Sequence, residues 1–152
     1  MFMKEQDAIS GKQAKAYMTI DEKVEELFYA KKLESTIEKS KSDVPVLGKT
    51  NVGKKAAGWS GSGTLTVYYI TSLFRNKIRE YVKTGVDFYF DLMVTNEDPA
   101  STVGKQTTVL KNCNLDSITA AAFDATSDDM LEEELAFTFD DYDITDWFGA
   151  PQ

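Results

Sequence analysis

The sequence of 152 residues contains no histidine and only one cysteine, Cys113. Without histidine, the chain cannot form a Ser-His-Asp triad, a Cys-His pair or a histidine-ligated metal site. A single cysteine cannot form a disulfide bond within the chain, which is typical of a protein made in a reducing cytoplasm. Carboxylate and lysine chemistry stay open, but we expect a protein that is not an enzyme and has no catalytic, cofactor-binding or metal-binding residues.

Long hydrophobic runs are also absent from the chain. No apolar run could span a membrane, and residues 1–12 lack the apolar segment of a secretory signal, so we expect no stable membrane anchoring. A chain of this length most simply forms one domain, 1–152, whose core is large enough to fold without a disulfide or a metal.

Lysine and arginine are missing from residues 112–152, which hold 11 acidic residues. Residues 1–55, in contrast, hold 11 lysines against 9 acidic residues. With this distribution of charge, the chain lacks the basic surface that sequence-specific nucleic-acid binding requires. It permits self-association, because each copy carries a mildly basic region and a strongly acidic one.

Alternation of apolar and polar residues predicts a mainly β protein, a β-sandwich or barrel. The segment 24–39 also fits a helix by propensity, but Tyr29, Leu33 and Ile37 alternate as on one face of a long strand, which we favour. The expected strands are 14–20, 24–39, 64–70, 86–95, 107–118 and 135–142, and we expect the fifth to continue through the alanines towards Phe123.

The period changes to helical spacing at about 71–84, where Phe74, Ile78, Tyr81 and Val82 recur on one side. Thr71 or Ser72 can cap the start of this helix, and Gly85 can end it. We therefore expect a single helix packed on the strands.

A Gly/Lys-rich segment at about 48–63 begins with GKTNVGK, which is close to a phosphate-binding loop. However, Lys55 follows Lys54 where such a loop needs Ser or Thr for Mg²⁺, and the next predicted element is a strand instead of a helix. We interpret the segment as an extended, flexible loop. Trp59 within it is a candidate contact residue, because large exposed aromatic side chains often mark interaction surfaces.

The residues SDDMLEEE at 127–134 predict an acidic loop or a single turn. The run lacks the alternate carboxylates and central glycine of an EF-hand loop, so we do not expect a calcium site.

Several stretches resemble the phage tail tube protein of contractile tails from Gram-positive phages and defective phage-like elements, the subunit that R-type bacteriocins also use. The most specific are the Gly/Lys segment running into GTLTVYY, the ITSLF that opens the helix, and LEEELAFTFDDYDI near the end. The resemblance covers nearly the whole chain.

This resemblance implies a tail tube fold, a β-sandwich flanked by a helix, related to the tube of type VI secretion systems. Six copies would form a ring whose inner sheets join into one barrel, and rings would stack head-to-tail inside a sheath. The implied partners are further copies, a tail sheath protein, and baseplate and tail terminator proteins, without a cofactor. The implied location is a virion or an extracellular tail-like particle assembled in the bacterial cytoplasm. The implied function is DNA passage through the lumen in a phage, or puncture of the target membrane in a bacteriocin.

The charge asymmetry adds a hypothesis about contacts between subunits: the lysines of the Gly/Lys segment meet the acidic run of a neighbour. The alternative is that both segments are merely solvated. A type VI-like secreted tube and a monomeric β-sandwich binding module also stay open as functions. The candidate inter-subunit contacts are Lys49, Lys54, Lys55, Trp59, Asp128, Asp129, Glu132, Glu133 and Glu134.

Overall fold

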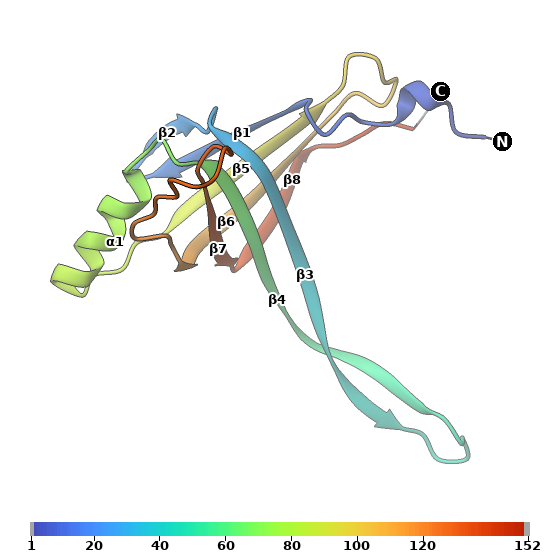
Figure 1. Ribbon diagram of the computed structural model, residues 1–152. Helices are drawn as coiled ribbons and strands as arrows, with labels where there is room; N and C mark the ends of the chain where they lie inside the picture. Colours follow the sequence, from blue (N-terminus) through green and yellow to red (C-terminus); the bar gives the residue numbers. More distant parts are fainter. Residues whose placement is uncertain (1, 151–152) are drawn as a thin grey trace.

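A computed structural model describes residues 2–150 and shows a β-rich body from which one long hairpin projects (Figure 1). The prediction of a mainly β protein with one α-helix is confirmed. The elements are η1 (Glu5–Asp7), β1 (Ala14–Ile20), β2 (Lys23–Glu26), β3 (Ala30–Pro45), β4 (Val52–Tyr68), α1 (Leu73–Thr84), β5 (Phe90–Glu97), β6 (Lys105–Ser117), β7 (Glu132–Phe139) and β8 (Asp141–Asp146).

The strands form one antiparallel sheet in the order β2-β1-β5-β6-β7-β4-β3, with β8 also paired to β6. The first part of β6 pairs with β5 and β8, whereas its last part pairs with β7. Between these parts, Asn112 has a φ of 54°, and the register shifts opposite it between Phe90 and Leu92. Asn tolerates this left-handed backbone better than most residues, and a bulge bends a strand. The bend turns the sheet back on itself around the core.

The core lies between the two halves of this curved sheet, and Phe74 of α1 packs into it. The inward faces predicted for β4, β5 and β7 are confirmed, since Leu65, Leu92 and Phe137 are buried together with residues two positions away. The buried apolar side chains are Met18, Ile20, Leu27, Tyr29, Leu65, Val67, Phe74, Phe90, Leu92, Leu110, Cys113, Leu115, Leu135, Phe137 and Phe139.

The single helix α1 begins and ends as predicted. Ser72 is its N-cap residue, and the hydroxyl of Thr71 accepts a hydrogen bond from the Leu73 backbone N–H at 3.3 Å. Gly85 ends the helix with a φ of 77°, and its N–H donates to the Tyr81 carbonyl at 2.7 Å. This left-handed C-cap favours glycine.

Several strand boundaries differ from the sequence prediction, including that of β5, which begins at Phe90 where we predicted residue 86. The segment 24–39 is divided into β2 and the start of β3, because the chain turns at residues 28 and 29, where the Ala30 N–H donates to the Leu27 carbonyl at 3.1 Å. The helical alternative for this segment is wrong. The strand β6 ends at Ser117, before the alanines, and β7 already begins at Glu132. The predicted acidic loop at 127–134 is therefore wrong for its last three residues.

The largest correction concerns the Gly/Lys segment, which we predicted as a flexible loop at about 48–63. Most of it is strand: β4 runs from Val52 to Tyr68 and pairs with β3, leaving only residues 46–51 as the connection. The two strands form the long hairpin that leaves the body in Figure 1.

Two glycines of this segment are needed for close packing and not for flexibility. Gly61 pairs with Phe139 and Gly63 pairs with Phe137 on β7. A Cβ atom at Gly61 would lie 2.4 Å from the Phe139 ring, and one at Gly63 would lie 2.6 Å from the Phe137 ring. The aromatic rings cover the glycine backbone across the strands, which compensates for the missing side chains.

Candidate assembly surfaces

In the outer part of the hairpin, residues 38–60, the backbone of β3 and β4 pairs with no third strand. On the other side of β4, pairing with β7 begins only at Gly61. Nearly every residue of the outer hairpin is exposed on both faces of the ribbon. A two-stranded ribbon without a core is at best marginally stable in water. The outer hairpin is therefore a surface that another chain can complete.

The end of the hairpin carries an apolar cluster, which we call the apolar tip: Val44, Val46, Leu47 and Val52. All four side chains are exposed, and Leu47 is fully so at 102%. The backbone N–H of Lys49 donates to the Val46 carbonyl at 3.2 Å, which holds the turn between the strands. Exposed apolar clusters of this kind mark interaction sites.

The candidate lysines of the hairpin are not equivalent. Lys54 forms an ion pair with Asp43, its cross-strand partner within the same hairpin. Within residues 2–150, no ion pair involves the ammonium groups of Lys49 or Lys55. Lys49 and Lys55 are therefore available to a partner, whereas Lys54 already has one.

Trp59 lies where the outer hairpin joins the body. Its ring centroid is 6.3 Å from that of Phe139, and the residue is 46% exposed. One side of the ring thus extends the core and the other side faces solvent. That arrangement is compatible with the predicted contact role, which stays a prediction.

Glu133 was predicted as an inter-subunit contact, and the structure contradicts this. Because side chains alternate along β7, Glu133 points inward with Leu135 and is only 2% exposed. Its Oε2 accepts a hydrogen bond from Arg75 Nη1 of α1 at 2.8 Å, while Oε1 has no hydrogen-bond partner within the described chain. Burial raises the pKa of the Glu133 carboxyl, and Arg75 offsets part of this rise.

Arg75 makes further contacts that attach α1 to the end of the sheet. Its guanidinium lies 4.1 Å from the ring centroid of Tyr69 and also donates to the Thr71 carbonyl. The alternation of EEELAFTF from 132 onward could have revealed Glu133 as an inward residue, but nothing in the sequence pointed to Arg75 as its partner.

The other acidic candidates lie on the surface. Glu132 pairs with Lys31, and this hydrogen bond raises the pKa of the Lys31 ammonium. Glu134, Asp128 and Asp129 are exposed. Asp128 and Asp129 belong to the segment 118–131, which returns to the base of the hairpin (Figure 1) and is tied there by a hydrogen bond from the Tyr69 N–H to the Leu131 carbonyl.

A groove of about 550 Å³ lies at the base of the hairpin, and we call it the basal groove. Three of its lining side chains are largely exposed: Phe28 at 79%, Ile70 at 67% and Met130 at 74%. Asp129 also lines the groove. The full lining is Phe28, Tyr29, Tyr68, Tyr69, Ile70, Asp129, Met130 and Leu131.

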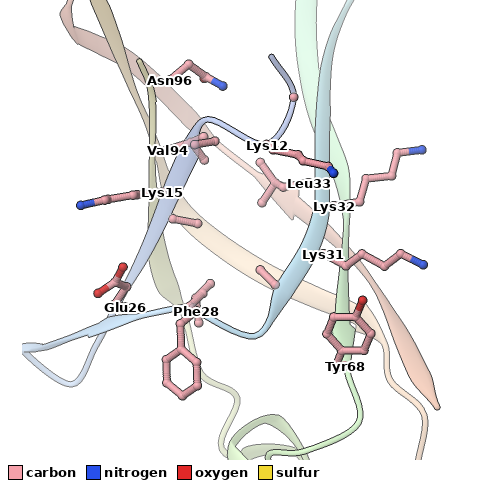
Figure 2. A pocket seen from close by; sticks show the side chains of 15 residues that line it. Lys12, Lys15, Glu26, Phe28, Lys31, Lys32, Leu33, Tyr68, Val94 and Asn96 are labelled. Carbon is pink, nitrogen blue, oxygen red and sulfur yellow. The ribbon is translucent and has the colours of Figure 1, made fainter. Parts of the chain in front are cut away.

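A larger cavity, of about 830 Å³, lies between β1 and β3, which do not pair with each other. Figure 2 shows Lys12 pointing across this gap towards Leu33, while Lys15 points away from it. Alanine and valine side chains contribute to the wall, including Ala16 and Val94. Among residues 2–150, no group of three or more Cys, Asp or Glu residues could hold a metal ion. The gap marks the place where the curved sheet stays open.

Nothing in the sequence pointed to the anchor of the N-terminal segment. Asp7 Oδ1 accepts hydrogen bonds from the Thr102 backbone N–H at 3.0 Å and from the Thr102 hydroxyl at 2.7 Å. These hydrogen bonds lower the pKa of the Asp7 carboxyl. The N–H of Gly149 donates to the Val103 carbonyl at 2.7 Å, so both chain ends meet the β5–β6 loop at one end of the molecule (Figure 1).

Cys113 is a buried core residue, as its place in a predicted strand suggested. Burial raises the pKa of its thiol to about 12, which keeps it protonated and unreactive at neutral pH. In the described part of the chain, no helix has the length and apolar character needed to cross a membrane.

Comparisons with known proteins agree with this geometry. A family model described as "Phage tail tube protein" matches residues 1–146. The phage-like element PBSX protein XkdM of Bacillus subtilis (strain 168) is 38% identical over 144 residues, which cover 95% of each chain.

Solved structures show the same fold. A chain in the anti-feeding prophage cap matches with a TM-score of 0.73 at 17% identity, over 95% of each chain. A chain in the sheath–tube complex of the extracellular contractile injection system PVC matches with a TM-score of 0.66 at 21% identity, over 91% of each chain. Identities this low establish the fold alone.

Proposed function

The chain belongs to the phage tail tube protein family, and on this premise we propose that six copies form a ring and that rings stack into a hollow tube. The tube is a structural component without a catalytic step, enclosed by a contractile sheath. Tail sheath, baseplate and terminator proteins are its partners. The tube is assembled in the bacterial cytoplasm and works in a virion or an extracellular tail-like particle.

The observation that carries this proposal is the outer hairpin. Residues 38–45 and 52–60 pair with each other as strands although no third strand joins them. A chain that builds such an arm needs a neighbour to cover it, because an isolated ribbon gains too little from burial to offset its lost conformational entropy. A monomeric binding module would have no need for this element.

The outward face of β3, β4 and β7 is suited to line the channel. Inward residues such as Leu65 and Leu135 alternate with short polar residues on this face. The carboxylates of Glu38 and Glu134 add negative charge, and the ammonium of Lys32 lies 3.7 Å from the Glu34 carboxylate. The hydroxyl-bearing residues of this face are Thr36, Ser40, Ser60, Ser62, Thr64, Thr66 and Thr138.

A face of this composition does not hold DNA by its phosphates. Duplex DNA binds to lysines and arginines that replace its counterions, and hydroxyls among carboxylates offer no such replacement. We therefore propose that DNA can pass along this face without being bound. Replacing Ser62 and Thr36 with lysine would test this, because the variant tube would bind duplex DNA at low salt while the original tube would not.

Electron microscopy of the purified full chain tests the proposed assembly. We expect hollow rings with six-fold symmetry, and stacks of rings as the concentration rises. Sedimentation over the same concentration series gives the mass of the smallest assembly. The proposal fails if the protein stays monomeric at every concentration and also when it is produced together with its sheath and baseplate proteins.

A further inference from the structure

Residues 2–13, which we call the strap, place almost no apolar side chains against the body. Asp7 is the only buried residue among them, and Ile9 is half-buried. Phe2 and Met3 are 96% and 73% exposed. Because burial of apolar side chains is the main force that holds a segment to a protein body, the strap must be held in another way.

Hydrogen bonds to the β5–β6 loop hold the strap, and we call this set of bonds the clasp. Asp7 Oδ1 accepts from the N–H and the hydroxyl of Thr102, at 3.0 and 2.7 Å. In the opposite direction, the Ser101 hydroxyl donates to the Asp7 carbonyl at 3.2 Å. Further along the strap, the Ser10 N–H donates to Asp98 Oδ2 at 3.0 Å. The clasp is therefore made of polar contacts that centre on one carboxylate.

The clasp leaves part of that carboxylate unsatisfied. Asp7 Oδ2 is buried and accepts no hydrogen bond from residues 2–150. A buried carboxylate oxygen without a donor offsets part of what the hydrogen bonds to the other oxygen contribute. Within the same residues, no ion pair joins the strap to the body. The docked strap is thus only slightly favoured over a released one.

The loop that receives the strap has hydrogen bonds of its own. Asp98 Oδ1 accepts from the Ala100 N–H at 3.0 Å, and the Val103 N–H donates to the Ser101 hydroxyl at 3.3 Å. The Gly149 N–H donates to the Val103 carbonyl at 2.7 Å. The loop can therefore keep its shape when the strap leaves, and the clasp can form again.

The far end of the strap lies at the cavity between β1 and β3. Gly11 and Lys12 belong to the lining of this cavity, and Figure 2 shows Lys12 pointing across it towards Leu33. Ala16 and Val94 line the same cavity from the sheet. Release of the strap would take Gly11 and Lys12 away and open the apolar wall to solvent.

We propose that the strap is a releasable lid over this cavity, which opens and closes as a unit while the core stays folded, and that the contact between Asp7 and Thr102 sets the balance. Local opening of this kind is expected where a segment buries few apolar side chains. The inference concerns the body of a single chain and no residue of the outer hairpin, so it does not depend on the proposed tube.

Hydrogen exchange of the full chain tests whether the strap opens by itself. The amides of Ser10 and Thr102 donate into the clasp and report on it, and the amides of β5 and β7 report on the core. We expect low concentrations of urea to leave exchange of the clasp amides unchanged while they accelerate exchange of the core amides. Clasp amides with the urea dependence of the core would overturn the proposal, because the strap would then open only when the body unfolds.

Substitutions on both sides of the clasp test what holds it. Asp7→Ala should accelerate exchange of the Ser10 amide roughly tenfold, and Thr102→Val, which removes only the hydroxyl, should accelerate it less. The double variant should add little to Asp7→Ala alone, because both changes remove the same contact. The matched control Glu5→Ala removes an exposed carboxylate from the same turn and should change nothing. Unchanged exchange in Asp7→Ala, or equal acceleration in Glu5→Ala, would overturn the role of the clasp.

Acid gives an independent readout of the same contact. The hydrogen bonds from Thr102 lower the pKa of Asp7, burial opposes this, and the charge of Lys4 lowers it further. Asp98 is the ionisable group of the loop that contacts the strap. Because the pKa of Asp7 is lowered in the docked state, protection of the Thr102 amide should be complete above about pH 3.8 and fall as the pH drops through the lowered value. Asp7→Asn should not show this fall, and equal pH dependence in both proteins would contradict the assignment to Asp7.

An added thiol tests whether the strap covers the cavity. Val94→Cys places a thiol in the cavity lining. The native Cys113 does not interfere, because it is buried and the pKa of its thiol is raised to about 12. We expect a thiol reagent to label the new cysteine roughly tenfold faster once Asp7→Ala is added, in step with exchange of the Ser10 amide. Labelling at the same rate with and without Asp7→Ala would overturn the lid, because the cavity would then be equally open with the strap docked or released.

Discussion

The hairpin contains two regions with the same secondary structure and different sources of stability. In the inner region, Gly61–Tyr68 pairs with β7, and Leu65 and Val67 are buried in the core. In the outer region, β4 has β3 as its only neighbour and exposes both faces. The inner region is stabilised within the monomer, whereas the outer region depends on an assembly. Mutations should therefore affect folding in the first region and association in the second.

The largest effect on folding is expected at the ion pair that attaches α1 to the inner region. Glu133→Ala removes the carboxylate that pairs with Arg75 and leaves the guanidinium partly buried, with a side chain 18% exposed. We expect a loss of about 3 kcal/mol in the free energy of unfolding, measured by urea denaturation.

Two controls define the cause of that loss. The exposed neighbour Glu134→Ala should change the free energy of unfolding by less than about 0.5 kcal/mol. The double replacement Glu133→Leu with Arg75→Met should recover most of the loss, because it removes both charges together. An equal loss in Glu133→Ala and Glu134→Ala would show that the buried pair contributes nothing.

The next effect concerns the glycines under the aromatic rings. An added Cβ at Gly63 would lie 2.6 Å from the Phe137 ring and 2.7 Å from the Glu34 carbonyl oxygen. We expect Gly63→Ala to lower the free energy of unfolding by about 2 kcal/mol, because both neighbours must shift.

Gly53→Ala in the outer region is the matched control for Gly63→Ala. Its added Cβ would meet only the Val44 carbonyl oxygen, at 3.4 Å, an ordinary contact. The thermal unfolding midpoint of this variant should stay close to that of the original chain. A similar drop in both variants would mean that loss of glycine flexibility, and not ring packing, is responsible.

These glycines also show which parts of the structure could be predicted from the sequence. The helix was placed correctly because its evidence is local: helical spacing, Ser72 before it and Gly85 after it. The inward faces of β4 and β7 followed from alternation alone. The strand character of Gly61 and Gly63 depends on Phe139 and Phe137, which lie far away in the sequence, so local composition suggested a loop instead.

For the candidate contacts, the sequence predicted the segments but not the ion pairs within the chain. Composition correctly indicated an unusual lysine-bearing segment and an acidic segment, but ion pairs depend on which residues the fold brings together. Lys54 meets Asp43 only because of the register of the hairpin, and Glu133 meets Arg75 only because α1 packs beside β7. Neither pairing leaves a pattern in the sequence.

Two carboxylates of the body should respond to pH in opposite directions. Hydrogen bonds from Thr102 lower the pKa of Asp7 below its usual 3.8. The stability that Asp7 contributes is therefore present above about pH 3.8 and is lost as the pH falls through the lower folded-state value. Asp7→Asn should remove this acid-dependent loss, seen as a flatter dependence of the free energy of unfolding on pH in that range.

Glu133 should behave in the reverse manner, because burial raises its pKa above the usual 4.5. Its contribution is complete below about pH 4.5 and declines as the pH rises through the raised value. Relative to Glu133→Gln, the original chain should therefore lose stability as the pH rises from about 4.5 towards neutrality. A rise in the stability of the original chain relative to Glu133→Gln over the same pH range would contradict the raised pKa.

The smallest effect on folding is expected from removing most of the outer region. Replacing residues 40–58 with Asn-Gly joins the paired residues Lys39 and Trp59 by a two-residue turn of the type that matches the strand twist. The core and the pairing of β4 with β7 remain, so the free energy of unfolding should change by less than about 1 kcal/mol. Assembly, followed by electron microscopy, should be lost because the part of the hairpin that a neighbouring copy would cover is gone. A large loss of stability in the monomer would instead mean that the outer hairpin supports its own body, and the division between a self-stabilised and an assembly-stabilised region would have to be abandoned.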